Sequence, residues 1–141
     1  MYPVHWRNYP NTVPLTWKQV KFTSANASQI PDDKTGVYSF VADAGIAQHP
    51  AGCYLLYVGK VKDQNLRTRY RQYLRAETAW KNRPHIAQMI SKWSEHLWFY
   101  YAEISDPKII NQLEEDLITA FLPPENRSWP AKITHIMRMV F

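Results

Sequence analysis

The sequence is poor in cysteine, glycine and metal-ligand patterns, and each absence excludes a class of chemistry. Its single cysteine, Cys53, cannot form an internal disulfide. The four glycines are too dispersed for a phosphate-binding loop, which argues against nucleoside triphosphate chemistry. No two histidines lie within four residues on one predicted helix, so each is interpreted as structural or surface. The histidines are His5, His49, His85, His96 and His135.

The chain also lacks a charged-then-apolar leader, a long apolar run, repeats and low-complexity segments. We therefore expect a cytoplasmic protein without a membrane partner. Hydrophobic residues make up 45% of the 141 residues, which is enough for one domain with a moderate core.

Positive charge is concentrated in one segment of the chain. The formal net charge is +5, but residues 60–83 contain eight basic and two acidic residues and sum to +6, so the remainder sums to −1. An ordinary solvated helix face would mix both signs. The concentration of basic charge instead predicts a polyanion-binding face.

The segment 55–74 changes from apolar to basic and organises the prediction. Residues 55–58 are typical of a buried strand, and Gly59 is predicted to end it at a sharp turn, with Lys60 at the strand's mouth. Residues 66–74 have helical spacing with one apolar face, and a second stripe of arginines lies four residues apart. The residues predicted to bind nucleic acid are Lys62, Arg67, Arg71 and Arg75.

A second strand is predicted upstream, over 36–42, and it begins with Gly36. We expect it to form a hairpin with the strand at 53–58. Together, GVY at 36–38, YVG at 57–59, NLRTRYRQYL at 65–74 and LEEDLITAFLPPEN at 113–126 resemble, in this order, the GIY-YIG nuclease family. The resemblance implies a small α/β domain of the α+β kind, with a three-stranded central sheet flanked by three helices. The catalytic residues it implies are Tyr38, Tyr57, Lys60, Arg69, Tyr73, Glu114 and Asn126.

Two features of the resemblance concern spacing. Eighteen residues separate Tyr38 from Tyr57, more than is usual in the family, so the hairpin loop over 43–52 is predicted to be enlarged. The family glutamate could be Glu114 or Glu115, and the alignment of the neighbouring apolar residues favours Glu114. Consecutive helical residues point about 100° apart, so one of the two glutamates faces the site.

The remaining elements follow from periodicity and helix-end signals. We expect a helix over 85–94, a third strand over 97–104 and a helix from Pro107 to about residue 122, with Asp106 as its N-cap. Two prolines, Pro123 and Pro124, then stop the helix.

The predicted nuclease core covers residues 36–126. Residues 1–35 are expected to form an extension packed on this domain, with a short strand over 17–22, and residues 127–141 an apolar tail that adds a strand. Trp6, Tyr9 and Trp17 are expected to pin the extension rather than stack on bases.

The resemblance also implies a mechanism for phosphodiester hydrolysis. Glu114 would hold one Mg²⁺ or Mn²⁺ ion, since such ions prefer oxygen ligands and keep several waters beside a single carboxylate. Arg69 would stabilise charge on the phosphate through its planar fork. Tyr73, one turn later, would orient that guanidinium, and Asn126 would hold Glu114 or its own loop.

Water activation is assigned to a tyrosine, Tyr38 or Tyr57, which would position or deprotonate the water. The pKa of an isolated tyrosine is about 10, so a base needs a neighbouring cation, and Lys60 is the candidate. Taken singly, each tyrosine is better explained by packing with a satisfied hydroxyl, but the ordered set of motifs favours the catalytic interpretation.

Two other functions remain open at the level of sequence. One is a nucleic-acid-binding module without catalysis, and the other is a nuclease subunit of a larger assembly. The expected partner is nucleic acid, with DNA favoured, and targeting would come from a partner protein or a homo-oligomer.

Overall fold

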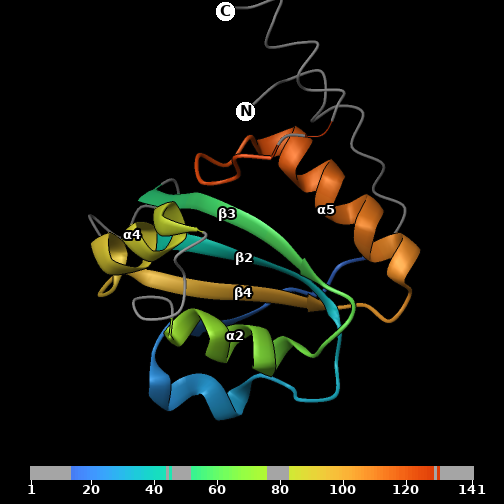
Figure 1. Cartoon of the computed structure of the whole chain (residues 1–141), viewed down its shortest axis with the longest axis horizontal. Helices are drawn as coiled ribbons and strands as arrows, with labels where there is room; N and C mark the ends of the chain where they lie inside the picture. Colours follow the sequence, from blue (N-terminus) through green and yellow to red (C-terminus); the bar gives the residue numbers. More distant parts are fainter. Residues whose placement is uncertain (1–13, 44, 46–51, 76–82, 129, 131–141) are drawn as a thin grey trace, which may run out of the picture.

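The computed structural model describes residues 14–43, 45, 52–75, 83–128 and 130. Helices cover both faces of a central sheet (Figure 1). In chain order, the described elements are β1 (Lys18–Lys21), the 3-10 helix η1 (Ser24–Gln29), β2 (Gly36–Asp43), β3 (Cys53–Val61), α2 (Leu66–Leu74), α4 (Pro84–Trp93), β4 (Leu97–Glu103) and α5 (Pro107–Phe121). The mixed α/β class is confirmed, as are the three predicted helices.

The sheet has four antiparallel strands in the order β1-β4-β2-β3. The predicted β2–β3 hairpin and its pairing with β4 are confirmed. The short strand predicted over 17–22 is confirmed as β1. It joins the central sheet along β4, with Lys18 opposite Tyr101 and Lys21 opposite Trp98, so the prediction of a three-stranded sheet is wrong. Most of the tail over 127–141, which is predicted to add a strand, and most of the predicted loop over 43–52 lie outside the described residues.

Gly59 lies inside β3, and the prediction that it ends the strand is wrong. Tyr38 of β2 is directly opposite Gly59 in the ladder. A side-chain carbon on Gly59 would collide with the ring and hydroxyl of Tyr38. The missing side chain therefore gives the phenol of Tyr38 room to lie over the backbone of β3.

The two faces of the sheet bury separate apolar clusters. Helix α5 packs on one face, where Ile110, Leu113 and Leu117 meet Val37 and Val58. Helices α2 and α4 and η1 cover the other face (Figure 1). That second cluster is rich in aromatic rings, which pack edge-on or stacked. Its aromatic members include Phe22, Tyr38, Phe40, Tyr70, Tyr73 and Phe99.

Capping side chains set where α2 and α5 begin. Asn65 accepts a hydrogen bond from the backbone amide of Thr68 at 2.7 Å and starts α2. Asp106 accepts one from Lys108 at 2.8 Å, which confirms it as the N-cap of α5. Leu122 has a left-handed backbone, with φ of 48°, and ends α5. The backbone amide of Glu125 then donates to the carbonyl of Leu56 in β3 at 3.0 Å, so the chain returns to the sheet.

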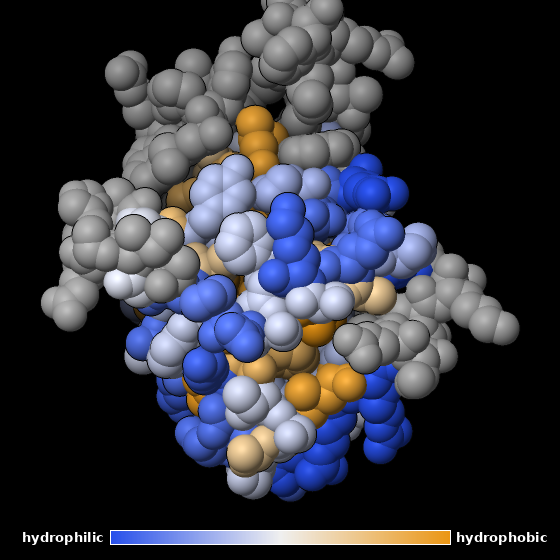
Figure 2. Space-filling model, turned by 90° about the vertical axis from the view of Figure 1, so that its left-hand side faces the viewer, coloured by the Kyte–Doolittle hydropathy of each residue, from blue (hydrophilic) through white to orange (hydrophobic). Residues whose placement is uncertain are grey.

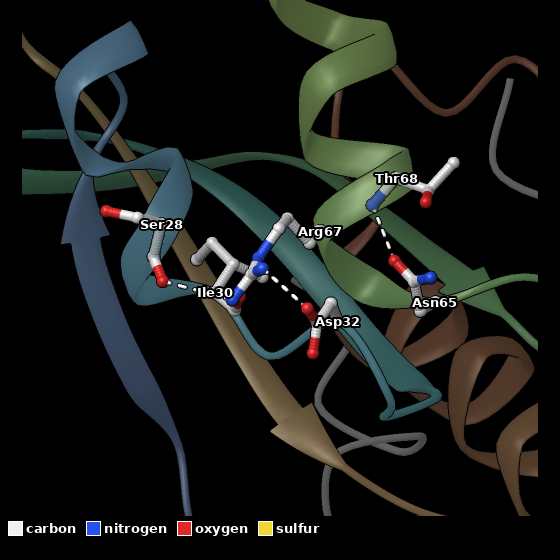
Figure 3. Close-up of polar contacts among 6 residues, drawn as sticks. All are labelled: Ser28, Ile30, Asp32, Asn65, Arg67 and Thr68. Atoms are coloured by element: carbon white, nitrogen blue, oxygen red, sulfur yellow. Dashed lines mark hydrogen bonds and ion pairs between the residues drawn. The ribbon is translucent and has the colours of Figure 1, made fainter.

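Arg67 connects α2 to η1 and to the segment that follows η1 (Figure 3). Its guanidinium donates to the carbonyl oxygens of Ile30 at 2.6 Å and Ser28 at 3.2 Å, and to the Asp32 carboxylate at 2.7 Å. The backbone amide of Arg67 also donates to the carbonyl of Pro31 at 3.2 Å. These contacts favour a structural role, so we do not keep Arg67 in the nucleic-acid-binding set.

Replacing Arg67 with Ala is expected to destabilise the fold by about 2 kcal/mol, because two backbone carbonyls lose a charged donor. Asp32→Asn is the matched control and should cost well under about 1 kcal/mol, since the Asp32 side chain is 65% exposed. Urea unfolding of both variants measures the difference. Equal losses would mean that the ion pair, rather than the carbonyl contacts, accounts for the stabilisation.

Among the residues that the structure describes, no helix has the length and apolarity to span a membrane. Figure 2 shows the side that lies at the left of Figure 1, where hydrophilic residues cover most of the coloured surface and hydrophobic ones form small areas between them.

Candidate active site

A polar cleft of about 480 Å³ lies beside β3. Residues from both faces of the sheet line it, together with residues of α5 and of the chain after α5. Residues far apart in the sequence line it. Six of the seven predicted catalytic residues are among them: Tyr38, Tyr57, Lys60, Arg69, Glu114 and Asn126. The seventh, Tyr73, contacts Tyr38 behind the cleft wall.

Lys60 and Glu114 form an ion pair, with 2.7 Å between Nζ and Oε2. Lys60 is opposite Val37 in the ladder, and Val37 belongs to the face that α5 covers, so Lys60 meets that helix. The Lys60 and Glu114 side chains are 31% and 17% exposed. The next residue, Glu115, is exposed and does not line the cleft. Of the two glutamates, the cleft therefore contains Glu114.

The tyrosines differ in their surroundings. Tyr38 is 2% exposed, and its hydroxyl shares a hydrogen bond of 2.6 Å with that of Tyr73. Burial, together with the neighbouring Tyr57, raises the pKa of Tyr38 far above its ordinary value, although Arg69 opposes this. Tyr38 is thus neutral at pH 7 and suited to orienting a ligand rather than accepting a proton. The Tyr57 ring lies 6.3 Å from that of Tyr38 and also lines the cleft.

Arg69 lies on the inner face of α2 and reaches the cleft, and Gln64 holds its guanidinium. With the amide oxygen of Gln64 turned towards it, the guanidinium donates hydrogen bonds of 3.1 Å from Nε and 3.0 Å from Nη2. Arg69 lines the cleft, and its positive charge acts on Tyr38. Arg71 and Arg75, on the same helix, and Lys62 are exposed.

Asn126 fastens the segment after α5 to the edge of the sheet. Its side-chain oxygen accepts from the amide of Val58 at 2.9 Å, and its nitrogen donates to the carbonyl of Val58 at 2.7 Å. Asn126 is 6% exposed, so both groups of the buried amide are satisfied. Of the two predicted roles for Asn126, the geometry supports holding its own loop.

Sequence reasoning missed a second group of cleft residues: Arg83, His85, Glu125, Arg127 and Ser128. They come from the start of α4 and from the chain after α5, and His85 had been interpreted as structural or surface. Burial lowers the pKa of His85, and Arg127 lowers it further. The sequence signal that could have found this group is weak, namely two arginines in loops that only the fold brings together.

The carboxylates of the cleft decide whether it fits a divalent cation. In the described parts of the chain, no three His, Cys, Asp or Glu side chains are grouped as a metal site. Mg²⁺ rarely uses such a cage and is often held by one or two carboxylates together with substrate phosphates and waters. Glu114, a partly buried carboxylate in a cleft with basic walls, fits binding of this kind.

Comparisons with protein-family models, curated protein sequences and solved structures found no match to this chain.

Proposed function

We propose that this protein is a metal-dependent endonuclease of the GIY-YIG type that hydrolyses phosphodiester bonds in nucleic acid, with DNA as the expected substrate. One observation carries the proposal. Side chains selected from the order of sequence motifs between residues 38 and 126 converge on a single polar cleft. Independent packing residues would not be expected to share a solvent-accessible cleft with a carboxylate and two basic side chains.

Charge stabilisation in the proposed reaction belongs to Arg69 and Lys60. The planar guanidinium of Arg69 can contact two non-bridging oxygens at once, and Gln64 limits its rotation. Lys60 forms an ion pair with Glu114. A phosphate entering between them would give Lys60 a second anionic partner and leave the Glu114 carboxylate to the cation.

The water-positioning role is assigned to Tyr57. The Tyr38 hydroxyl is engaged by Tyr73, and burial holds the pKa of Tyr38 high, so Tyr38 would donate a hydrogen bond that fixes the water or the phosphate. Tyr73 would then act as a positioning residue for Tyr38. Mg²⁺ or Mn²⁺ bound by Glu114 would supply charge neutralisation and a lower pKa for a bound water.

Substrate binding outside the cleft is assigned to the exposed basic residues Lys62, Arg71 and Arg75. Contacts of this kind follow the phosphate backbone and carry no base information. Binding should therefore weaken with salt and show little sequence preference.

Incubation of the purified chain with labelled DNA and Mg²⁺ or Mn²⁺ is expected to give cleavage products with internal ends. Addition of a chelator should stop cleavage and leave binding intact, because the basic residues do not depend on the ion. Supercoiled plasmid and branched DNA, run beside single-stranded RNA, test the substrate form. Cleavage that continues unchanged in chelator would contradict the metal-dependent mechanism.

The Lys60–Glu114 ion pair also favours a second candidate, a nucleic-acid-binding module without catalysis. In that case Lys60 would be the permanent partner of Glu114, and the carboxylate would have no need of a metal ion. Salt-sensitive DNA binding with no cleavage under any divalent ion would select this candidate.

A further inference from the structure

The cleft is divided into two electrostatic groups. Tyr38 interacts with Tyr57, Tyr73, Arg69 and Glu114, which form the proposed catalytic half. The charged groups that affect His85 are different, namely Arg127, Glu125 and Arg83. Both sets line the same cleft. The second set comes from the start of α4 and from the chain after α5, and the proposed mechanism does not use it; we call it the second region.

The second region has a surplus of positive charge. Of the three charged residues that act on His85, Arg83 and Arg127 are basic and Glu125 is acidic. His85 lies among them and, because its pKa is lowered, is neutral at pH 7, so it adds a hydrogen-bond donor without charge. Ser128 adds a hydroxyl. Two guanidinium groups, an imidazole and a hydroxyl are donors suited to phosphate oxygens.

Both supporting segments of this region are fixed to the sheet. Asn126 and the amide of Glu125 bond to the backbone of β3, which holds the residue next to them, Arg127. The helix that begins at Pro84 buries Ile86 and Met89 in the core. The two segments that carry the donors are therefore anchored to the same core as the proposed catalytic residues, as a binding subsite requires.

We propose that Arg83, His85 and Arg127 form a subsite for the backbone phosphate next to the scissile one. This inference rests on the proposed nuclease function and specifies its substrate class as a continuous strand rather than a terminal nucleotide or an isolated phosphodiester. Internal bonds would be preferred, because a strand that ends at the scissile bond fills one of the two phosphate positions.

The test combines variants of the subsite with DNA in which single phosphates are replaced by neutral methylphosphonates. Arg83→Gln and Arg127→Gln remove charge with a modest change of size, and Lys92→Gln, an exposed position on the same helix α4, is the matched control. Unfolding midpoints verify that each variant is folded. Cleavage of unmodified DNA by the parent chain measures the proposed function separately from the subsite.

In the parent, neutralising one phosphate adjacent to the cut is expected to slow cleavage about tenfold, the loss of one charge-assisted contact. In the double variant Arg83→Gln/Arg127→Gln, cleavage of unmodified DNA should fall by a similar factor, and the same methylphosphonate should then cause no further loss. Lys92→Gln should behave like the parent.

Two results would overturn the inference. If the parent cuts DNA and the losses from the double variant and the methylphosphonate simply multiply, the arginines do not contact that phosphate, and the nuclease function stands. If the parent neither cuts nor binds DNA, the subsite falls together with the proposed function.

Discussion

Glu114→Gln is expected to abolish Mg²⁺-dependent cleavage while DNA binding stays at least as strong. Gln keeps the size of the side chain but loses the charge that would hold the cation. A metal ion supplies several kcal/mol to such a reaction, so cleavage should fall about 10³-fold or more. Binding should not weaken, because the change removes a negative charge from a cleft that also contains Lys60 and Arg69.

Two control variants separate the metal role of Glu114 from its ion pair. Glu115→Gln changes the neighbouring exposed residue, so it should cut nearly as the parent does. Lys60→Gln removes the partner that Glu114 contacts at 2.7 Å but keeps the carboxylate. It should slow cleavage and still show saturation with Mg²⁺, whereas Glu114→Gln should not. Parental cleavage by Glu114→Gln would refute the metal assignment.

The grouping of the proposed catalytic residues in one cleft was predictable because these residues lie in motifs with a recognisable order. The spacing within α5 favoured Glu114 over Glu115, and the structure has Glu114 in the cleft. The half that contains Arg83, His85 and Arg127 was not predictable. Those residues lie near helix ends and in loops, and they meet because Asn126 pairs with Val58 across a separation of 68 residues.

Fold prediction succeeded where apolar periodicity was strong and failed where tertiary contacts decide the conformation. The stripe Ile110, Leu113 and Leu117 identified α5 correctly. A strand was predicted over 17–22, but Val20 is the one buried residue among the four of β1, so this weak alternation did not show that the strand joins the central sheet. Gly59 resembled a turn, but its role is to admit the ring of Tyr38, a contact that no local pattern records.

Arginine spacing on α2 was a second limit of the sequence. Residues 67, 71 and 75 are four apart and share a stripe, so they were predicted to have a common function. The first of them, at the start of the helix, meets the carbonyls of Ser28 and Ile30. The other two are exposed. Equal spacing therefore placed these arginines on one side of the helix but could not show that another segment covers one end of it.

Arg69→Lys is expected to reduce cleavage about 10²- to 10³-fold with little change in DNA affinity. Lysine keeps the positive charge, and long-range attraction of the strand depends mainly on charge. The ammonium group cannot make two parallel hydrogen bonds to phosphate oxygens, nor can it keep the Nε contact with Gln64 while it does so. The loss should therefore appear in the rate of the chemical step, which single-turnover cleavage at saturating protein measures.

Arg71→Lys is the matched control, since Arg71 is exposed on the same helix and is assigned to sequence-independent binding. It should cut at the parental rate. A further variant, Gln64→Ala, leaves the Arg69 fork intact but removes the acceptor that limits its rotation. It should give a smaller loss than Arg69→Lys, again in the chemical step. If Arg69→Lys cleaves as fast as Arg71→Lys, Arg69 is one more phosphate contact, and transition-state stabilisation must come from Lys60 and the cation held by Glu114.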